Sequence, residues 1–178
     1  KINVIEYVEI MTTADAIDFG DLSVIRGYNA GFSSGTRAFA AGGSGTDSID
    51  MITMAAKGNA IDFGSLTTSG RNRPSGFGNS TRGIVASGAS TLSSIDAFTT
   101  SSGGNAVDYG NLIVARDSVA GGCTHVRGII AGGSTSGSPN GTNSIEFISM
   151  QSFGSAKDFG DLATTKGAFI NCCSDSHG

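Results

Sequence analysis

The triplet Asp-Phe-Gly, once written Asp-Tyr-Gly, occurs four times along the chain and limits what this sequence can fold into. Its aspartates recur after 44, 46 and 50 residues, at Asp18, Asp62, Asp108 and Asp158. An apolar–acidic pair recurs upstream in the same steps, at Ile5-Glu6, Ile49-Asp50, Ile95-Asp96 and Ile145-Glu146. A period of about 40–50 residues is typical of repeat architectures, so we expect residues 1–178 to form one repeat domain of about four units.

Two basic positions belong to the same repeat: the first follows the leucine after each triplet, and the second comes eleven residues later. The first position holds Arg26, Arg71, Arg116 and Lys166, and the second holds Arg37, Arg82, Arg127 and His177. One acid and one base per unit can form ion pairs, and aspartate also bonds the amides of tight turns. We therefore expect a structural role for the aspartates of the triplets and the arginines of the second position, in ion pairs between units or in bonds to turn amides.

Each unit divides into four segments of strand length, bounded by Gly, Ser, Asn and Thr. In and next to the second unit they are "RAFAAGG" (37–43), "SIDMITM" (48–54), "NAIDFGSL" (59–66) and "SGFGN" (75–79). The segment "IEYVEI" (5–10) alternates apolar and polar residues, as a half-buried strand does. No segment of the sequence is long enough and free enough of Gly and β-branched residues to predict a helix, so we expect an all-β protein.

The doubled glycines Gly42-Gly43 and Gly132-Gly133, each following an apolar segment and preceding a strand of the "SIDMITM" kind, resemble the kelch repeat. That resemblance implies a β-propeller in which each unit of about 45 residues forms one four-stranded blade. Kelch repeats usually carry a tryptophan late in the unit, whereas this chain has none, and Asp-Phe-Gly-x-Leu takes that place. A β-solenoid or a β-prism is the alternative, although solenoid coils usually need only about 20–30 residues.

The chain begins and ends inside a unit. Only four residues precede Ile5, and the final His177-Gly178 matches Arg82-Gly83 and Arg127-Gly128, where the next strand is expected to start. One strand is therefore lacking from a ring of four units. We expect a segment of a longer propeller, the alternative being a four-unit ring without its closing strand.

The amino-acid sequence of the first unit, "IEYVEIMTTADAIDFGDL" (5–22), is similar to tandem repeats in structural proteins of marine bacteriophages, especially those that infect cyanobacteria. That resemblance implies a virion or extracellular location, in a tail, fibre or capsid-surface assembly. It also implies multivalent contact with a host surface glycan or with protein subunits of the assembly.

Composition argues against several other partners. The net charge is −4, 15% of residues are charged and no basic run is present, so we do not expect nucleic-acid binding. No apolar stretch approaches bilayer length, so we do not expect membrane insertion.

Cys123 and Cys173 share one repeat position with Ser33 and Gly78, which we interpret as a position for a small residue. A disulfide between Cys172 and Cys173, or a bridge to another chain, is the alternative.

The sequence carries no recognisable catalytic or metal-binding pattern. The kinase meaning of Asp-Phe-Gly fails because neither a Gly-rich loop with a strand lysine nor a His-Arg-Asp segment accompanies it. Cys123 and His125 match no structural zinc spacing and have no third group to orient them. We therefore predict a non-enzymatic protein without a cofactor or metal, the alternative being a glycan-acting or oxidase-like propeller enzyme.

The units differ most in two loops, which is where repeat scaffolds carry recognition. The stretch after the doubled glycine grows from "GGSGTDS" (42–48) to "GGSTSGSPNGTNS" (132–144), and "RNRPSGFGNSTR" (71–82) adds basic and aromatic side chains. Such side chains suit a carbohydrate or protein surface, although solvated loops and a self-assembling subunit that forms homo-oligomers through open sheet edges are alternatives. The candidate binding residues are Arg71, Arg73, Phe77, Asn79, Ser136, Asn140 and Asn143.

Overall fold

The computed structural model describes residues 2–88, 92–136, 141–167 and 171–172, and in this part of the chain the regular elements are all strands. The expectation of an all-β protein is confirmed. The strands are β1 (Ile2–Tyr7), β2 (Ile17–Arg26), β3 (Ala30–Ser33), β4 (Arg37–Ala41), β5 (Ser48–Thr53), β6 (Ile61–Ser65), β7 (Ser75–Gly78), β8 (Arg82–Ala86), β9 (Ser94–Thr99), β10 (Val107–Asn111), β11 (Ala120–Cys123), β12 (Arg127–Ala131), β13 (Thr142–Ser149) and β14 (Lys157–Lys166).

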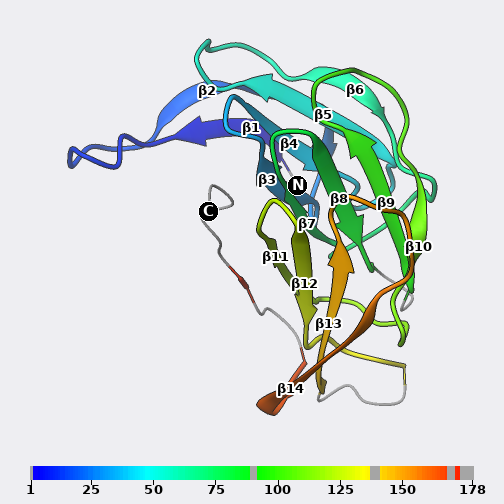
Figure 1. The fold of residues 1–178 in the computed structure, drawn as a ribbon. Coiled ribbons are helices and arrows are strands. Elements are labelled where there is room, and N and C mark those ends of the chain that lie inside the picture. The colour runs from blue at the N-terminus through cyan, green and yellow to red at the C-terminus, as the bar shows by residue number, and fades with distance from the viewer. Residues whose placement is uncertain (1, 89–91, 137–140, 168–170, 173–178) are drawn as a thin grey trace.

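The strands form four small antiparallel sheets in chain order. β1 pairs with β2, and each later group of four strands, β3–β6, β7–β10 and β11–β14, forms a meander in which sequence neighbours pair. The sheets follow one another along the molecule, and β7 contacts both β3 and β11, the first strands of the sheets on either side (Figure 1). Every described pairing is antiparallel and stays within one unit, unlike the parallel coil-to-coil pairing of a β-helix.

The Asp-Phe-Gly triplet forms a β-bulge at the start of the last strand in each unit. In the β9–β10 pair, Asp108 lies opposite Asp96 and Gly110 opposite Ile95, so Tyr109 is an extra residue on the bulged strand. The same register shift occurs in the other three sheets. A bulge re-aims a side chain and increases the local twist. In the second and third triplets the bulge thereby directs Phe63 and Tyr109 into the core between sheets.

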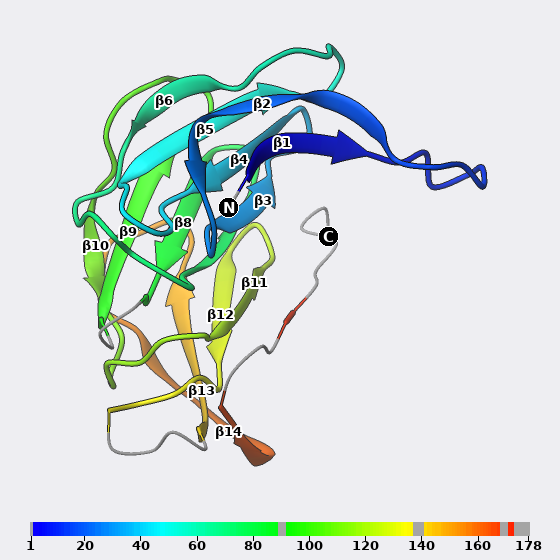
Figure 2. The ribbon, with the colours of Figure 1, turned by 180° about the vertical axis from the view of Figure 1, so that it is seen from behind.

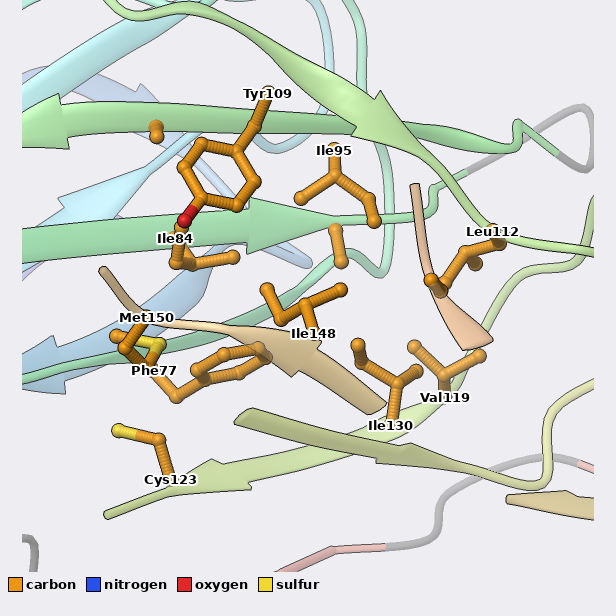
Figure 3. Close-up of a cluster of buried hydrophobic side chains, with 13 residues drawn as sticks. Phe77, Ile84, Ile95, Tyr109, Leu112, Val119, Cys123, Ile130, Ile148 and Met150 are labelled. Carbon is orange, nitrogen blue, oxygen red and sulfur yellow. The ribbon is translucent and has the colours of Figure 1, made fainter. Parts of the chain in front are cut away.

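The hydrophobic core lies between successive sheets. Alternation along β9 sends Ile95 and Ala97 toward the β11–β14 sheet, while Phe98 joins the cluster shared with the β3–β6 sheet. Figure 3 shows side chains of β8, β9 and β10 meeting Ile130 and Ile148 of the next sheet. Each sheet is too small to bury its own faces, so its stability depends on the neighbours that cover it.

Candidate functional site

The most regular polar feature is a buried ion pair at each junction between sheets. Each pair joins the first basic position of one unit to the acid in the third strand of the next unit. All six side chains are fully buried, with 0% exposure. The pairs are Arg26–Asp50 at 2.8 Å, Arg71–Asp96 at 2.9 Å and Arg116–Glu146 at 2.8 Å.

Each buried pair is anchored by further hydrogen bonds. Arg26 donates to the carbonyls of Ser48 and Ala40, and Asp50 accepts bonds from the amide and hydroxyl of Ser23. Desolvation lowers the pKa of all three arginines, and the neighbouring carboxylate opposes that change. Each arginine is fully buried and lies within 2.9 Å of a carboxylate of the next sheet, so it links two sheets and presents no exposed face to a ligand. Among the described residues, the Arg116 guanidinium makes no hydrogen bond that adds to its ion pair.

The triplets form a second contact between sheets. Asp62 accepts a bond from the Gly64 amide at 3.1 Å and is exposed, so its role is local to the bulge. Gly64 has a φ of +153°, and a Cβ there would lie 2.2 Å from the carbonyl oxygen of Gly104 in the next sheet. This close approach lets the Gly104 and Ala106 amides donate to the strand that carries the triplet. The Gly20 and Gly110 junctions repeat this arrangement.

The second-position arginines reach across the junctions by a different route. Arg37 donates to the Thr100 carbonyl at 2.7 Å, and Arg82 donates to the Met150 carbonyl at 2.6 Å. Both acceptors lie just after the third strand of the following sheet. Arg127 instead stacks over Phe147 of its own sheet, 4.9 Å from the ring centroid.

The ion pairs between sheets therefore use other acids and other arginines than the sequence predicted. The triplet aspartates Asp18, Asp62 and Asp108 accept bonds from the glycine amides of their own bulges and not from turn amides, while the ion pairs use the first basic position and the Ile-Asp/Glu acids. Asp158 is exposed on β14, and His177 lies outside the described residues. Both arrangements contribute to structure, since these groups bond within or between sheets.

A surface formed by the linkers between sheets brings an exposed tyrosine ring and a half-exposed arginine side chain together. Tyr28, Arg73 and Ser118 occupy the same repeat position, two residues after the buried arginine, and all adopt left-handed backbone with φ of 61°, 53° and 55°. The Arg73 amide donates to the Tyr28 carbonyl, and the Ser118 amide donates to the Arg73 carbonyl. The Arg73 guanidinium lies 5.5 Å from the Tyr28 ring centroid and 3.8 Å from an Asp117 carboxylate oxygen. We call Tyr28, Arg73, Asp117 and Ser118 the linker surface.

The variable loops border this linker surface. Asp117 and Ser134 exchange two backbone hydrogen bonds of 2.9 Å, which places the start of the 132–144 loop beside the linker. In the first complete sheet, the Ser44 amide donates to the Gly27 carbonyl in the corresponding way. The parts of the repeat that vary in length therefore meet the linkers at one end of the sheets.

The seven candidate binding residues fall into different environments. Arg71 is fully buried in its ion pair, and Phe77 is buried in the core. Asn79 is buried, accepts bonds from turn amides and donates to the His125 carbonyl. These three residues thus lie away from the solvent-facing loop in which the sequence placed them. Arg73 has a 48% exposed side chain, Ser136 is exposed, Asn143 is half-buried in β13, and Asn140 lies outside the described residues.

Sequence reasoning selected Arg73 but missed Tyr28 and Asp117. The available signal was positional, since Tyr28 and Arg73 both stand two residues after a first-position arginine. Repeat positions occupied by polar or aromatic residues in a linker could have been compared in the same way as the triplets.

Cys123 and His125 do not meet as a chemical pair. The Cys123 thiol is buried and donates to the Gly78 carbonyl at 3.2 Å, while the His125 side chain is exposed. Desolvation raises the pKa of Cys123 to about 11, an effect that the Gly78 hydrogen bond opposes. The interpretation of this position as a place for a small buried residue fits Cys123; Cys173 lies outside the described residues.

Within the described ranges, no group of three or more His, Cys, Asp or Glu side chains is placed to hold a metal ion. In the same part of the chain, no helix has the length and apolar character to cross a membrane. The sequence matches no protein-family model and no curated protein.

Proposed function

We propose that this chain is a non-enzymatic binding scaffold, in which kelch-like propeller blades present a ligand surface at the end where linkers and variable loops meet. In this proposal each sheet is one blade, and the first strands β3, β7 and β11 lie nearest the axis. The linker surface is the observation that carries it, because strained non-glycine residues recur at one repeat position and expose an aromatic ring and a guanidinium. Such backbone costs about 1–3 kcal/mol per residue and is found at functional sites.

The chemistry of the linker surface suits a carbohydrate. The Tyr28 ring, 59% exposed, offers an apolar face for the C–H side of a sugar, while Arg73 and Asp117 can bond its hydroxyls. A shallow site of this kind is weak by itself, and display in many copies converts it into avid attachment. We infer from the resemblance to phage repeat proteins that the setting is a virion tail, fibre or surface, and that the ligand is a host surface glycan.

The test is binding of the purified chain to arrayed bacterial surface polysaccharides and to whole bacterial cells. We expect Tyr28→Gly and Arg73→Ala each to lower binding by about 10-fold or more. Tyr28→Gly is the sharper variant, because glycine relieves the left-handed backbone and should not lower the melting temperature. A loss of binding at an unchanged melting temperature then comes from the missing ring and not from unfolding.

The matched control is Lys57→Ala, which removes another exposed cation stacked on a tyrosine, 4.8 Å from the ring centroid of Tyr7. This variant should bind as the parent does. Shortening 134–143 should weaken binding, since the start of that loop borders Asp117. Equal binding by the parent and Tyr28→Gly, or none to either probe, would contradict the glycan site. Turnover of an arrayed polysaccharide would favour the enzyme alternative.

A further inference from the structure

The outer face of the β11–β14 sheet has the composition of a buried junction, and no sheet of the described residues covers it. The β7–β10 sheet buries Ile84 and Tyr109 against its neighbour. The same repeat positions in the last sheet carry Ile129, which is half-buried, and Phe159, which is 53% exposed. A groove of about 440 Å³ lies over this face, lined by Val126, Ile129 and Phe159 among others. An apolar face of this kind marks an interaction site.

The polar groups that cross each junction are also present at this face. A Cβ at Gly64 or Gly110 would meet the backbone of the following sheet at 2.2 or 2.7 Å, whereas a Cβ at Gly160 would meet nothing within 4 Å. Arg37 and Arg82 reach carbonyls of the following sheet. The last sheet thus has the same triplet glycine, with its edge uncovered, and Arg127 is the donor that corresponds to Arg37 and Arg82.

The last unit has a basic residue and the first unit an acidic residue at the two repeat positions that form ion pairs elsewhere. Lys166 occupies the first basic position of the last unit, and Glu6 occupies the acid position of the first. Both residues are exposed, and no salt bridge joins either of them to another described residue. Figures 1 and 2 show β1–β2 and β14 at opposite ends of the row of sheets.

The residue that directly follows the leucine after each of the first three triplets matches the acid of the next unit, to which it donates hydrogen bonds. An aspartate is paired with a hydroxyl residue, and the longer glutamate with an apolar residue that offers only its amide; the three combinations are Asp50 with Ser23, Asp96 with Thr67, and Glu146 with Ile113. In the last unit this position is Ala163, which has no hydroxyl. Its expected partner is therefore a glutamate, and the acid of the first unit is Glu6.

We propose that the outer face of the β11–β14 sheet binds the β1–β2 sheet of a second copy of this chain, head to tail. Lys166 pairs with Glu6 of the second copy, and Ala163 donates its amide to the same carboxylate. Arg127 donates to the carbonyl of Ile10, the residue that corresponds to Thr100 and Met150. A heterologous contact of this type builds a closed ring or an open filament. The association is distinct from glycan binding, because none of these residues belongs to the linker surface.

The experiment is analytical ultracentrifugation of the whole chain from about 1 µM to about 1 mM, a range that spans weak to moderate association. The parent should form larger species as its concentration rises. Glu6→Lys and Lys166→Glu should each lower the association constant by about 10-fold or more, because each places like charges at the junction. Mixing these two variants should restore association, since each then meets the opposite charge on the other. The double variant should associate by itself for the same reason.

The charge controls are Glu9→Lys and Lys157→Glu, which change exposed residues near the same two ends. They should associate as the parent does. A parent that stays monomeric at every concentration, or a mixture of reversed variants that does not associate, overturns the proposal. Coupling of Glu6 and Lys166 in the melting temperature of a monomer would show closure within one chain, which also overturns binding of a second copy.

A gain of association provides an independent check. The residue that approaches the triplet glycine of the preceding unit is Gly58, Gly104 or Gly154, with φ of 151°, 145° and 154°, whereas the first unit has Ala14 there. Alanine disfavours that backbone, so Ala14→Gly should raise the association constant several-fold. An unchanged constant would contradict the docking of this segment on Gly160.

Discussion

The two faces of the β11–β14 sheet carry similar residues in opposite environments. The inner face buries Ile130 and Ile148 against the β7–β10 sheet, while the outer face leaves Ile129 half-buried and Phe159 exposed. The ionic groups follow the same division, since Arg116 is buried at the inner junction and Lys166 is exposed at the outer end. A repeat position becomes a core position only when the next unit covers it.

The largest difference in unfolding free energy between a covered and an uncovered site is expected at the first basic position of the repeat. Arg71→Met leaves Asp96 buried without its cation and should lower the free energy of unfolding by about 3–5 kcal/mol. Lys166→Met removes an exposed charge and should change it by less than about 0.5 kcal/mol. Urea denaturation of both variants at a concentration where the chain is monomeric measures the contrast. Similar losses in the two variants would show that coverage does not set the energy at this position.

The apolar positions should show the next largest difference. Ile84→Ala opens a cavity inside a covered junction and should cost about 2–4 kcal/mol. Ile129→Ala, at the corresponding position of the outer face, should cost about 1 kcal/mol or less, because solvent already reaches that side chain. Chemical denaturation with matched m-values provides the comparison. A cost for Ile129→Ala equal to that for Ile84→Ala would mean that the outer face is as well packed as the inner one.

Alanine variants of two triplet glycines distinguish the energy of backbone strain from that of a clash with the next sheet. Gly64 and Gly160 share positive φ, at 153° and 140°, so an alanine is strained at both positions. Only the Gly64→Ala methyl group meets the following sheet, and we expect this variant to be less stable than Gly160→Ala by about 1–3 kcal/mol. Thermal unfolding of both variants at low concentration tests the expectation, which equal melting temperatures would refute.

The smallest effect is expected at Cys123, which packs in the covered junction and also lines the outer groove. Burial raises its pKa from 9.0 to about 11, so the folded state holds the thiol proton more tightly than the unfolded state does. Stability from this group is complete below pH 9 and declines as the pH rises through about 11. The difference in stability between the parent and Cys123→Ala should therefore shrink over this range. A constant difference from pH 8 to pH 11 would place the thiol in a wetter environment than the burial indicates.

Much of the strand pattern was accessible from the sequence. Four predicted segments contain the strands β4, β5, β6 and β7, namely 37–43, 48–54, 59–66 and 75–79. Short runs of β-branched and aromatic residues between glycines favour strands, so these segments could be recognised. The bulge at Asp62-Phe63-Gly64 was not predicted, although the segment 59–66 that contains this triplet was expected to form a strand. A bulge depends on which residue lies opposite, and that is a property of the pair of strands.

The candidate site was less predictable, because a repeat assigns the same spacing to every recurring residue. Any acid and any base of the unit could pair by that criterion, and the sequence favoured Asp62 and Arg82 over Asp96 and Arg71. Stacking of the sheets decided the partners by burying one set and leaving the other at a bulge or a carbonyl. Phe77 lies in β7 within the variable segment 71–82, and its burial has the same origin.

Period and alternation are local properties of the chain, so the unit, its strand content and its recurring positions follow from the sequence alone. Which side of each sheet is covered, which charges meet and which remain exposed depend on the stacking of the sheets, because one four-stranded sheet cannot bury its own two faces. Its apolar and charged positions acquire a role from the sheet that stacks on them, and on the outer face of β11–β14 those positions have no neighbouring sheet among the described residues.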